Sequence, residues 1–308
     1  MSITSFQSIR KAVGGLNPRS IRDLCDRPLN IALYASAPEN YRPLEEFFLQ
    51  GISEERRREA AKSLHRGPDP KGVLNFDIAI YDDSVLAPRR AMVFHRSNPD
   101  QLINDVLREH GGEVGLPLAR TFQPFRLPYI EQVIHRTSKE NAIFSMATAL
   151  PDIIPTLFEI PWAVTEFASD TAVLTANQIR MAFLIAAASD REVGFREQKR
   201  EIATVIGGAF GWRALARQLI SKIPFGAGVL PKAAVAYAAT RLVGLSLERY
   251  YRIGYPYTRQ ERQAVYGQAF EHGKAVARRI ISHLRPELVG KKSGTAPGDR
   301  EHQRSHHF

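Results

Sequence analysis

Four polar residues within a long apolar stretch have the spacing needed to form a site inside a helical bundle. At about 100° per residue, one face of a continuous helix carries this polar stripe: Glu166, Asp170, Asn177 and Arg180. Because unpaired buried charge is costly, we expect these side chains to pair with one another or with basic residues of another helix. Three interpretations are open: a register-fixing ion-pair network, a solvent-facing stripe, or a conduction or ligand site within a membrane bundle.

Metal and nucleophile chemistry have little support in the sequence. Asp82 and Asp83 follow an apolar run and are able to hold a metal, but two acids at a strand end are more often solvated turn residues. The histidines lack metal-ligand spacing, and no nucleophile elbow occurs. The single cysteine, Cys25, excludes an intramolecular disulfide and a cysteine-based zinc site. We therefore predict no catalytic residue, no metal and no cofactor.

A basic and aromatic segment lies near the C-terminus and is the strongest candidate for binding an anionic surface. It contains four arginines and four tyrosines: Arg249, Arg252, Arg259, Arg262, Tyr250, Tyr251, Tyr255 and Tyr257. Residues 126–308 hold 25 Lys+Arg against 16 Asp+Glu, whereas residues 1–125 hold 17 against 16. Such a cluster suits phospholipid head groups at least as well as nucleic-acid phosphates, and no nucleic-acid-binding signature accompanies it. The alternative is an ordinary solvated helix end.

Two different halves must position these residues. Three apolar runs of strand length, Leu29–Ser36, Phe76–Asp83 and Arg90–His95, alternate with helical segments, which is typical of a small α/β unit with a partly parallel sheet. The charged segment Glu54–His65 predicts an exposed helix. After Pro124 we expect six or seven helices and no strand, over these ranges: Pro128–Leu150, Ile160–Ser189 as one helix or two, Glu197–Gly207, Trp212–Ile223, Leu230–Arg252 and Thr258–His283.

The predicted fold class is therefore α+β, a small N-terminal α/β unit followed by a mainly α-helical domain. The predicted parts are an N-terminal helix and linker (1–26), a small α/β domain (27–124), an apolar all-α domain (125–284) and a disordered basic tail (285–308). The apolar stretches Ala142–Val164 and Leu230–Leu247 both contain charges, so neither is a clear membrane span. No signal-peptide core is present, and we predict a cytoplasmic chain.

Two motifs in the helical half support a family resemblance. An aspartate-bearing apolar helix leads into Leu-Thr-x-x-Gln-Ile-x-Met at Leu174–Met181. The turn Lys222–Gly228 precedes an alanine-rich helix and is one residue shorter between lysine and isoleucine than the family pattern. Through these features, roughly Pro128–Gly254 resembles the YcjF-like bacterial domain of unknown function. Such domains often lie behind an Era-type GTPase domain, and some relatives are thought to be membrane-associated.

The resemblance implies that Leu29–Ser36 stands where a first strand would lead into a phosphate loop. That loop needs glycines, whose backbone N–H groups surround phosphate, and a Lys-Ser/Thr pair. The segment Ala35–Arg42 has neither glycine nor lysine, Pro38 removes a donor, and Glu39 would repel phosphate. No Asp-x-x-Gly motif follows Phe76–Asp83. We therefore expect a degenerate GTPase-like unit that has lost its nucleotide chemistry.

The leading hypothesis is a non-enzymatic helical module that acts at or near the cytoplasmic membrane surface. Its expected partner is an anionic membrane surface or an unknown protein, with no specific nucleic acid. Two alternatives stay open: a soluble scaffold or interaction protein whose apolar helices are all buried in one core, and an atypical nucleotide-binding regulator.

Overall fold

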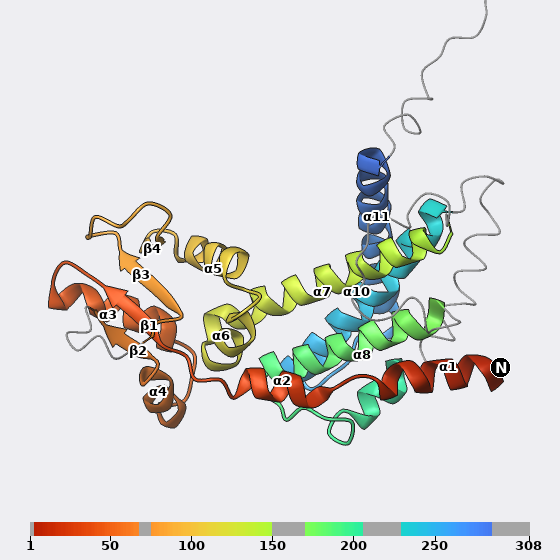
Figure 1. Ribbon diagram of the computed structural model, residues 1–308, viewed down its shortest axis with the longest axis horizontal. Helices are drawn as coiled ribbons and strands as arrows, with labels where there is room; N and C mark the ends of the chain where they lie inside the picture. The colour runs from red at the N-terminus through yellow and green to blue at the C-terminus, as the bar shows by residue number, and fades with distance from the viewer. Residues whose placement is uncertain (1–2, 68–74, 150–169, 206–228, 285–308) are drawn as a thin grey trace, which may run out of the picture.

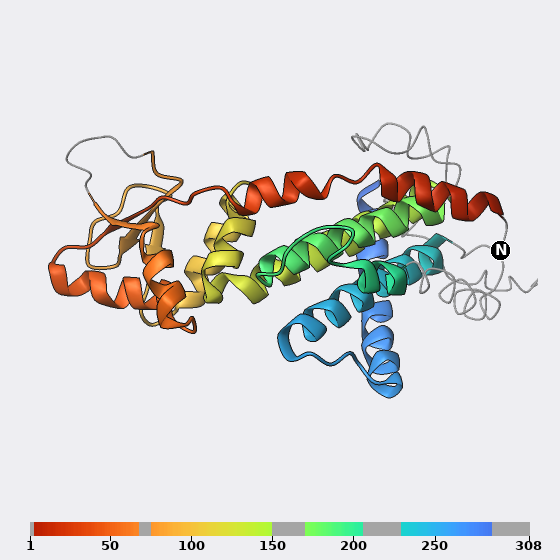
Figure 2. The same ribbon diagram turned by 90° about the horizontal axis from the view of Figure 1, so that it is seen from below.

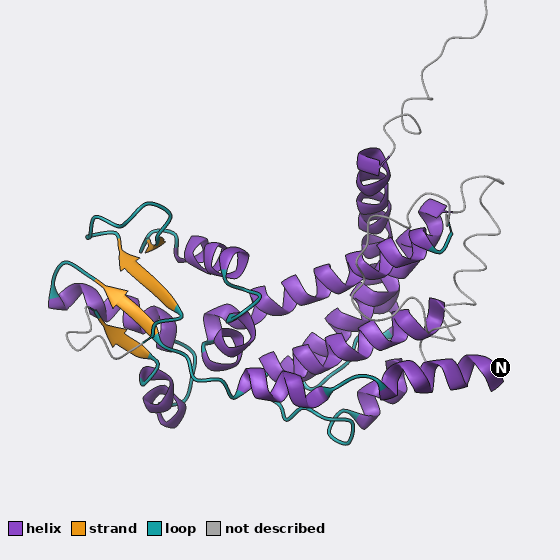
Figure 3. Cartoon of the chain, viewed as in Figure 1, coloured by secondary structure: helices purple, strands orange, loops and turns teal. Residues whose placement is uncertain are grey.

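The computed structural model describes residues 3–67, 75–149, 170–205 and 229–284. It confirms the predicted fold class, because a small sheet in the N-terminal part is followed by a mainly helical part. The sheet and its helices lie at one end of the molecule, and the long helices extend away from them (Figure 1). Figure 3 shows the strands gathered at this one end.

The sheet has four parallel strands, in the spatial order β2-β1-β3-β4, within the described residues. They are β1 (Ile31–Tyr34), β2 (Leu64–Arg66), β3 (Ile78–Asp82) and β4 (Met92–Phe94). All three strand pairings are parallel, so the described sheet is fully parallel, whereas the sequence led us to expect a partly parallel one. Ile31 aligns with Leu64 on one side and with Ile78 on the other, which places β1 in the interior of the sheet.

Strand β2 corrects the prediction that Glu54–His65 forms a single exposed helix. Helix α4 (Glu54–Ala61) ends earlier, and Leu64–Arg66 pairs with β1. The charged composition predicted helix correctly as far as Ala61. Beyond it, the backbone groups of β1 need partners on their open side, and three residues are enough to supply them. Only the folded sheet reveals this requirement.

One aromatic cluster joins the sheet unit to the long helices. Helix α3 (Pro38–Leu49) contacts β1 and β3 and buries Phe47 and Phe48. The Phe48 ring packs edge-on against Phe122 and is stacked with Phe125, at centroid distances of 5.0 and 5.7 Å. Two further helices, α5 (Pro99–Glu109) and α6 (Gly115–Thr121), complete this region. The predicted boundary at residues 124 and 125 therefore falls inside a shared hydrophobic core.

The N-terminal segment is more structured than the predicted helix and linker. It forms α1 (Ile3–Gly14) and α2 (Pro18–Cys25), separated by Asn17, whose side chain accepts a hydrogen bond from the Arg19 N–H at 3.0 Å. Both helices lie along the helical part, next to α8 (Figure 2). Ile9 and Ala12 pack against Ala172 and Ala176 of that helix.

The helical part is built from α7 (Gln123–Ala147), α8 (Asp170–Ala188), α10 (Val229–Ile253) and α11 (Arg259–Leu284), and a further helical segment covers 199–205. Helix α10 packs between α7 and α11, and its small residues allow this close approach. A side chain at Gly244 would lie 2.6 Å from Ile134. The predicted helix Trp212–Ile223 and residues 150–164 of the apolar stretch Ala142–Val164 lie outside the described residues.

One helix in the described part of the chain is long and apolar enough to cross a membrane. It is the Thr171–Ala188 stretch of α8, and 78% of that window is buried inside the structure. Helices α1, α2, α6, α7 and α10 surround it. Burial on all these sides is what a core helix of a folded domain shows, and the same length and composition are therefore weak evidence for a span.

Candidate functional site

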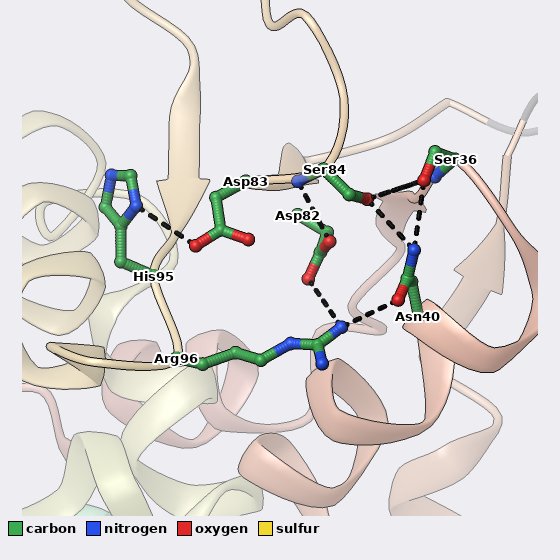
Figure 4. Close-up of polar contacts among 7 residues, drawn as sticks. All are labelled: Ser36, Asn40, Asp82, Asp83, Ser84, His95 and Arg96. Atoms are coloured by element: carbon green, nitrogen blue, oxygen red, sulfur yellow. Dashed lines mark hydrogen bonds and ion pairs between the residues drawn. The ribbon is translucent and has the colours of Figure 1, made fainter.

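The carboxyl ends of three parallel strands bring seven polar residues together at one edge of the sheet (Figure 4). They are Ser36, Asn40, Asp82, Asp83, Ser84, His95 and Arg96. Residue 36 follows β1, residues 83 and 84 follow β3, and residues 95 and 96 follow β4. In open α/β sheets with this strand order, ligands bind where the connections after β1 and β3 part in opposite directions.

Hydrogen bonds close that crevice here. The Ser36 hydroxyl donates to Ser84 Oγ at 2.9 Å, and the Ser36 backbone N–H lies 3.3 Å from the same oxygen. The Asn40 side-chain amide donates to Ser36 Oγ at 3.0 Å and to Ser84 Oγ at 3.3 Å. The loops after β1 and β3 are therefore joined to each other. The N–H group that would face a phosphate in a phosphate loop already donates to a side chain.

Asp82 is the most unusual residue of this edge, because it is a fully buried carboxylate. Its Oδ1 atom accepts the Ser84 N–H at 3.1 Å, whereas Oδ2 has no hydrogen bond among the described residues. The nearest cation is Arg96, with Nη2 at 3.6 Å from Oδ2. The same Nη2 atom donates to Asn40 Oδ1 at 2.9 Å. Arg96 therefore neutralises the buried carboxylate and links β4 to the hydrogen bonds of Ser36 and Ser84.

The two neighbouring acids behave differently, which the sequence did not distinguish. Asp83 is exposed, as expected of a turn residue, and lies 3.4 Å from His95 Nδ1. Asp82 is withdrawn from water. Within the described ranges, no group of three or more His, Cys, Asp or Glu side chains has the arrangement of a metal site. We call Ser36, Asn40, Asp82, Ser84 and Arg96 the sheet-edge network. Its members come from three separate parts of the chain, namely the start of α3 with the residues before it, the end of β3, and the residues after β4. No single local motif therefore connects them, and only their closeness to strand ends offered a signal.

The polar stripe of the helical half is only partly realised. Glu166 lies outside the described residues, and Asp170 begins α8 without a described side chain. Asn177 is half-buried, but Arg180 is exposed, so at Arg180 the structure agrees with the solvent-facing interpretation and not with a buried ion pair. Since α8 is covered on most sides, its remaining solvent-facing positions are the ones where a charge avoids desolvation.

Uncharged groups form the polar contact inside the bundle instead. Asn141 donates to Thr240 Oγ1 at 2.8 Å, and Gln178 donates to the same oxygen at 3.1 Å. Asn177 donates to Asn141 Oδ1 at 2.8 Å. Asn141 and Thr240 are fully buried, and Gln178 is 6% exposed. This amide network, Asn141, Asn177, Gln178 and Thr240, joins α7, α8 and α10. Sequence reasoning identified Asn177 but missed its partners, because they lie on other helices.

The four arginines predicted to bind an anionic surface lie in the last turns of α10 and the first turn of α11. Helix α10 ends at Ile253, and Gly254 follows it with a positive φ of 80°. A reciprocal Thr258–Glu261 capping box starts α11. Three apolar or aromatic residues are exposed between the last turn of α10 and the start of α11. Their exposed fractions are 38% for Tyr250, 44% for Ile253 and 74% for Tyr255. We call residues 250–262 the α10–α11 turn.

The four arginines are not equivalent. Arg249 pairs with Glu261 at 3.1 Å and lies over the Tyr257 ring at 4.6 Å, so it links α10 to the start of α11. This structural role replaces the predicted role of Arg249 in binding an anionic surface. Arg252 is exposed but pairs with Glu248 at 2.5 Å. Arg259 and Arg262 are exposed, and no ion pair to either is seen among the described residues. Tyr251 is half-buried beside Glu201, and burial raises the pKa of its hydroxyl.

Cys25 shows no sign of reactivity. It is half-buried near Arg120 and Asp190, and desolvation raises the pKa of its thiol to about 11. A thiol with such a pKa is protonated at neutral pH, and the thiolate is the nucleophile. The structure therefore places this residue among packing groups rather than reacting ones.

Comparison with known proteins adds no family to these observations: no protein-family model, curated protein or solved structure matches the chain significantly. The resemblance of Pro128–Gly254 to the YcjF-like domain accordingly stays a prediction.

Proposed function

We propose that this protein is a non-catalytic helical module that binds an anionic membrane surface through the α10–α11 turn. The main support is that Ile253 and Tyr255, which are both exposed, lie in the sequence between the exposed Arg252 and Arg259. Tyrosine suits an interface, because its ring is apolar and its hydroxyl is polar. Arginines beside it attract anionic head groups within a Debye length. The cytoplasmic face is the expected side, because that leaflet carries the anionic lipids.

The sheet-edge network supports the non-catalytic part of the proposal. A nucleotide would have to break the Ser36–Ser84 contact and approach the buried Asp82 carboxylate. We expect no measurable binding of GTP or ATP by calorimetry, with or without Mg²⁺, because nothing at this edge replaces the lost glycines and lysine. Micromolar affinity that disappears on Ser36→Ala would contradict this and favour the regulator hypothesis.

Vesicle flotation tests membrane binding. The full chain is expected to float with anionic vesicles at low salt, less so at physiological salt, and little with neutral vesicles. Neutralising both free arginines, as R259Q/R262Q, should lower the partition coefficient about 10- to 30-fold, since each basic residue near the surface contributes about 1 kcal/mol. The matched control is R58Q/R89Q, which removes the same charge from exposed positions of the α/β unit.

The apolar contribution is tested separately with I253S/Y255S. We expect weaker flotation on anionic vesicles, whereas Leu86→Ser should have no effect although Leu86 is 98% exposed, because it lies in the sheet unit. Equal partitioning of the wild-type chain on neutral and anionic vesicles would contradict the electrostatic part. Absence of flotation on both would favour the scaffold hypothesis, for which the burial of α8 is the supporting observation.

A further inference from the structure

A groove between α7 and α11 combines a basic rim with an apolar floor. Its volume is about 540 Å³, within the range of small-molecule sites. The rim holds His135, Lys139 and His272, with Arg279 beside them, and the floor holds Ile143, Val276 and Ile280. The floor residues are partly buried against the core formed with Ala142, Met146 and Tyr237. We call this cavity the basic groove, and it is separate from the α10–α11 turn.

The described residues that line the groove carry positive charge on Lys139 and Arg279, and no acid is among them. The four acids on α7 and α11 are paired elsewhere. They are Glu131 with Arg241 at 2.6 Å, Glu140 with Arg136 at 3.9 Å, Glu261 with Arg249 at 3.1 Å, and Glu271 with Lys274 at 2.7 Å. Lys139 has no ion pair among the described residues. An anion is therefore the partner that the groove lacks.

The histidines provide directional hydrogen-bond donors at the rim. His135 Nδ1 lies 3.0 Å from the hydroxyl of Tyr237, which is fully buried and also interacts with Arg241. In the tautomer whose Nδ1 accepts the tyrosine O–H, the Nε2–H of His135 is free to donate. The His272 ring packs edge-on at a centroid distance of 6.1 Å from His135.

The surroundings of His135 also oppose its protonation. Burial, then His272, Arg241 and Lys139 lower the pKa of His135, and Glu131 alone opposes them. The imidazole is therefore neutral at neutral pH while the groove is empty. A bound anion would offset the cationic neighbours, raise this pKa again, and be held more strongly by the charged imidazole.

We propose that the basic groove binds a single phosphate-bearing amphiphile, with the phosphate at the His135–Lys139–His272 rim and the first carbons of an acyl chain on the Ile143–Val276–Ile280 floor. Phosphate accepts hydrogen bonds from all three rim groups and matches their charge. The apolar floor has no role for an inorganic anion, which is why the occupant is an amphiphile. This site goes beyond the proposed function, because it takes a monomeric ligand and needs no bilayer.

The test is calorimetry on the full chain with dihexanoyl phosphatidic acid, kept below the concentration at which it forms micelles. We expect a dissociation constant of about 100 µM or tighter at neutral pH. Glycerol 3-phosphate should bind at least about tenfold more weakly, because it lacks the chains, and dihexanoyl phosphatidylcholine should bind more weakly, because its head group has no net charge. The variant K139Q/H272Q should lose about tenfold or more in affinity.

The matched control is R136Q/K274Q, which neutralises bases on the same two helices that do not line the groove. It should change affinity less than about twofold. If both variants lost the same affinity for dihexanoyl phosphatidic acid, the binding would come from general surface charge and the proposal would be wrong. Equal affinity for glycerol 3-phosphate would contradict the claim that the ligand is an amphiphile. If none of the three ligands bound, the claim that the groove is a binding site would be wrong. Vesicle flotation through the α10–α11 turn can succeed or fail independently of each of these results.

Discussion

Replacing Arg96 with alanine is expected to lower the free energy of unfolding by about 3 kcal/mol, because it leaves a buried carboxylate without its cation. Asp82 is fully buried, and Arg96 is the cation that approaches its unbonded Oδ2 atom. Removing Arg96 also leaves Asn40 Oδ1 without its donor. The estimate is at the low end for a buried pair, since the Arg96 side chain is 47% exposed. The measurement is urea unfolding, with the midpoint compared at constant slope.

A double mutant separates the charge effect from lost packing. In the D82N background, Asp82 carries no charge, so adding Arg96→Ala should cost clearly less than in the wild-type chain. Arg89→Ala, on the exposed loop between β3 and β4, is the matched control and should change the unfolding free energy by less than about 0.5 kcal/mol. A cost for Arg96→Ala that is unchanged by D82N would show that the ion pair is not what stabilises this edge.

The second large effect is expected at Thr240, where Thr240→Val should destabilise the protein by about 2–4 kcal/mol. The Thr240 hydroxyl accepts from both Asn141 and Gln178, and valine of nearly the same shape removes this acceptor from two buried amides. As a donor, the Asn141 side-chain NH2 retains only a long contact to the Leu174 carbonyl at 3.4 Å. Each unsatisfied buried donor costs about 1–3 kcal/mol, so two of them exceed any gain from the added methyl group.

Thr240→Ser is the control, because it keeps the hydroxyl and removes only a methyl group. It should cost about 1 kcal/mol, the loss expected for one buried carbon. If valine and serine were equally destabilising, packing rather than the amide network would account for the effect. A stabilising Thr240→Val would show that the amides find other acceptors, and would contradict the network as drawn.

In both halves of the protein, the sequence alone predicts the type and approximate position of most helices and strands. The three strands first expected, in 29–36, 76–83 and 90–95, are found as β1, β3 and β4, and the helices expected at 128–150, 230–252 and 258–283 are found as α7, α10 and α11 within a few residues. Periodicity, glycines and prolines are local signals, and local signals suffice for element type. The sequence also showed that Ala35–Arg42 has neither the glycines nor the lysine of a phosphate loop, because this depends on residue types in one short segment.

Contacts between segments far apart in the chain were decided only by the tertiary structure. Strand β2 pairs with the open edge of β1. Asp82 is buried because it ends β3, in which alternate residues face the core, whereas Asp83 is exposed in the turn that follows. Arg180 faces solvent and Arg249 turns inward for reasons that lie on other helices. The basic groove depends on which acids happen to be paired elsewhere. Burial and pairing are properties of the assembled core, so no sequence window contains them.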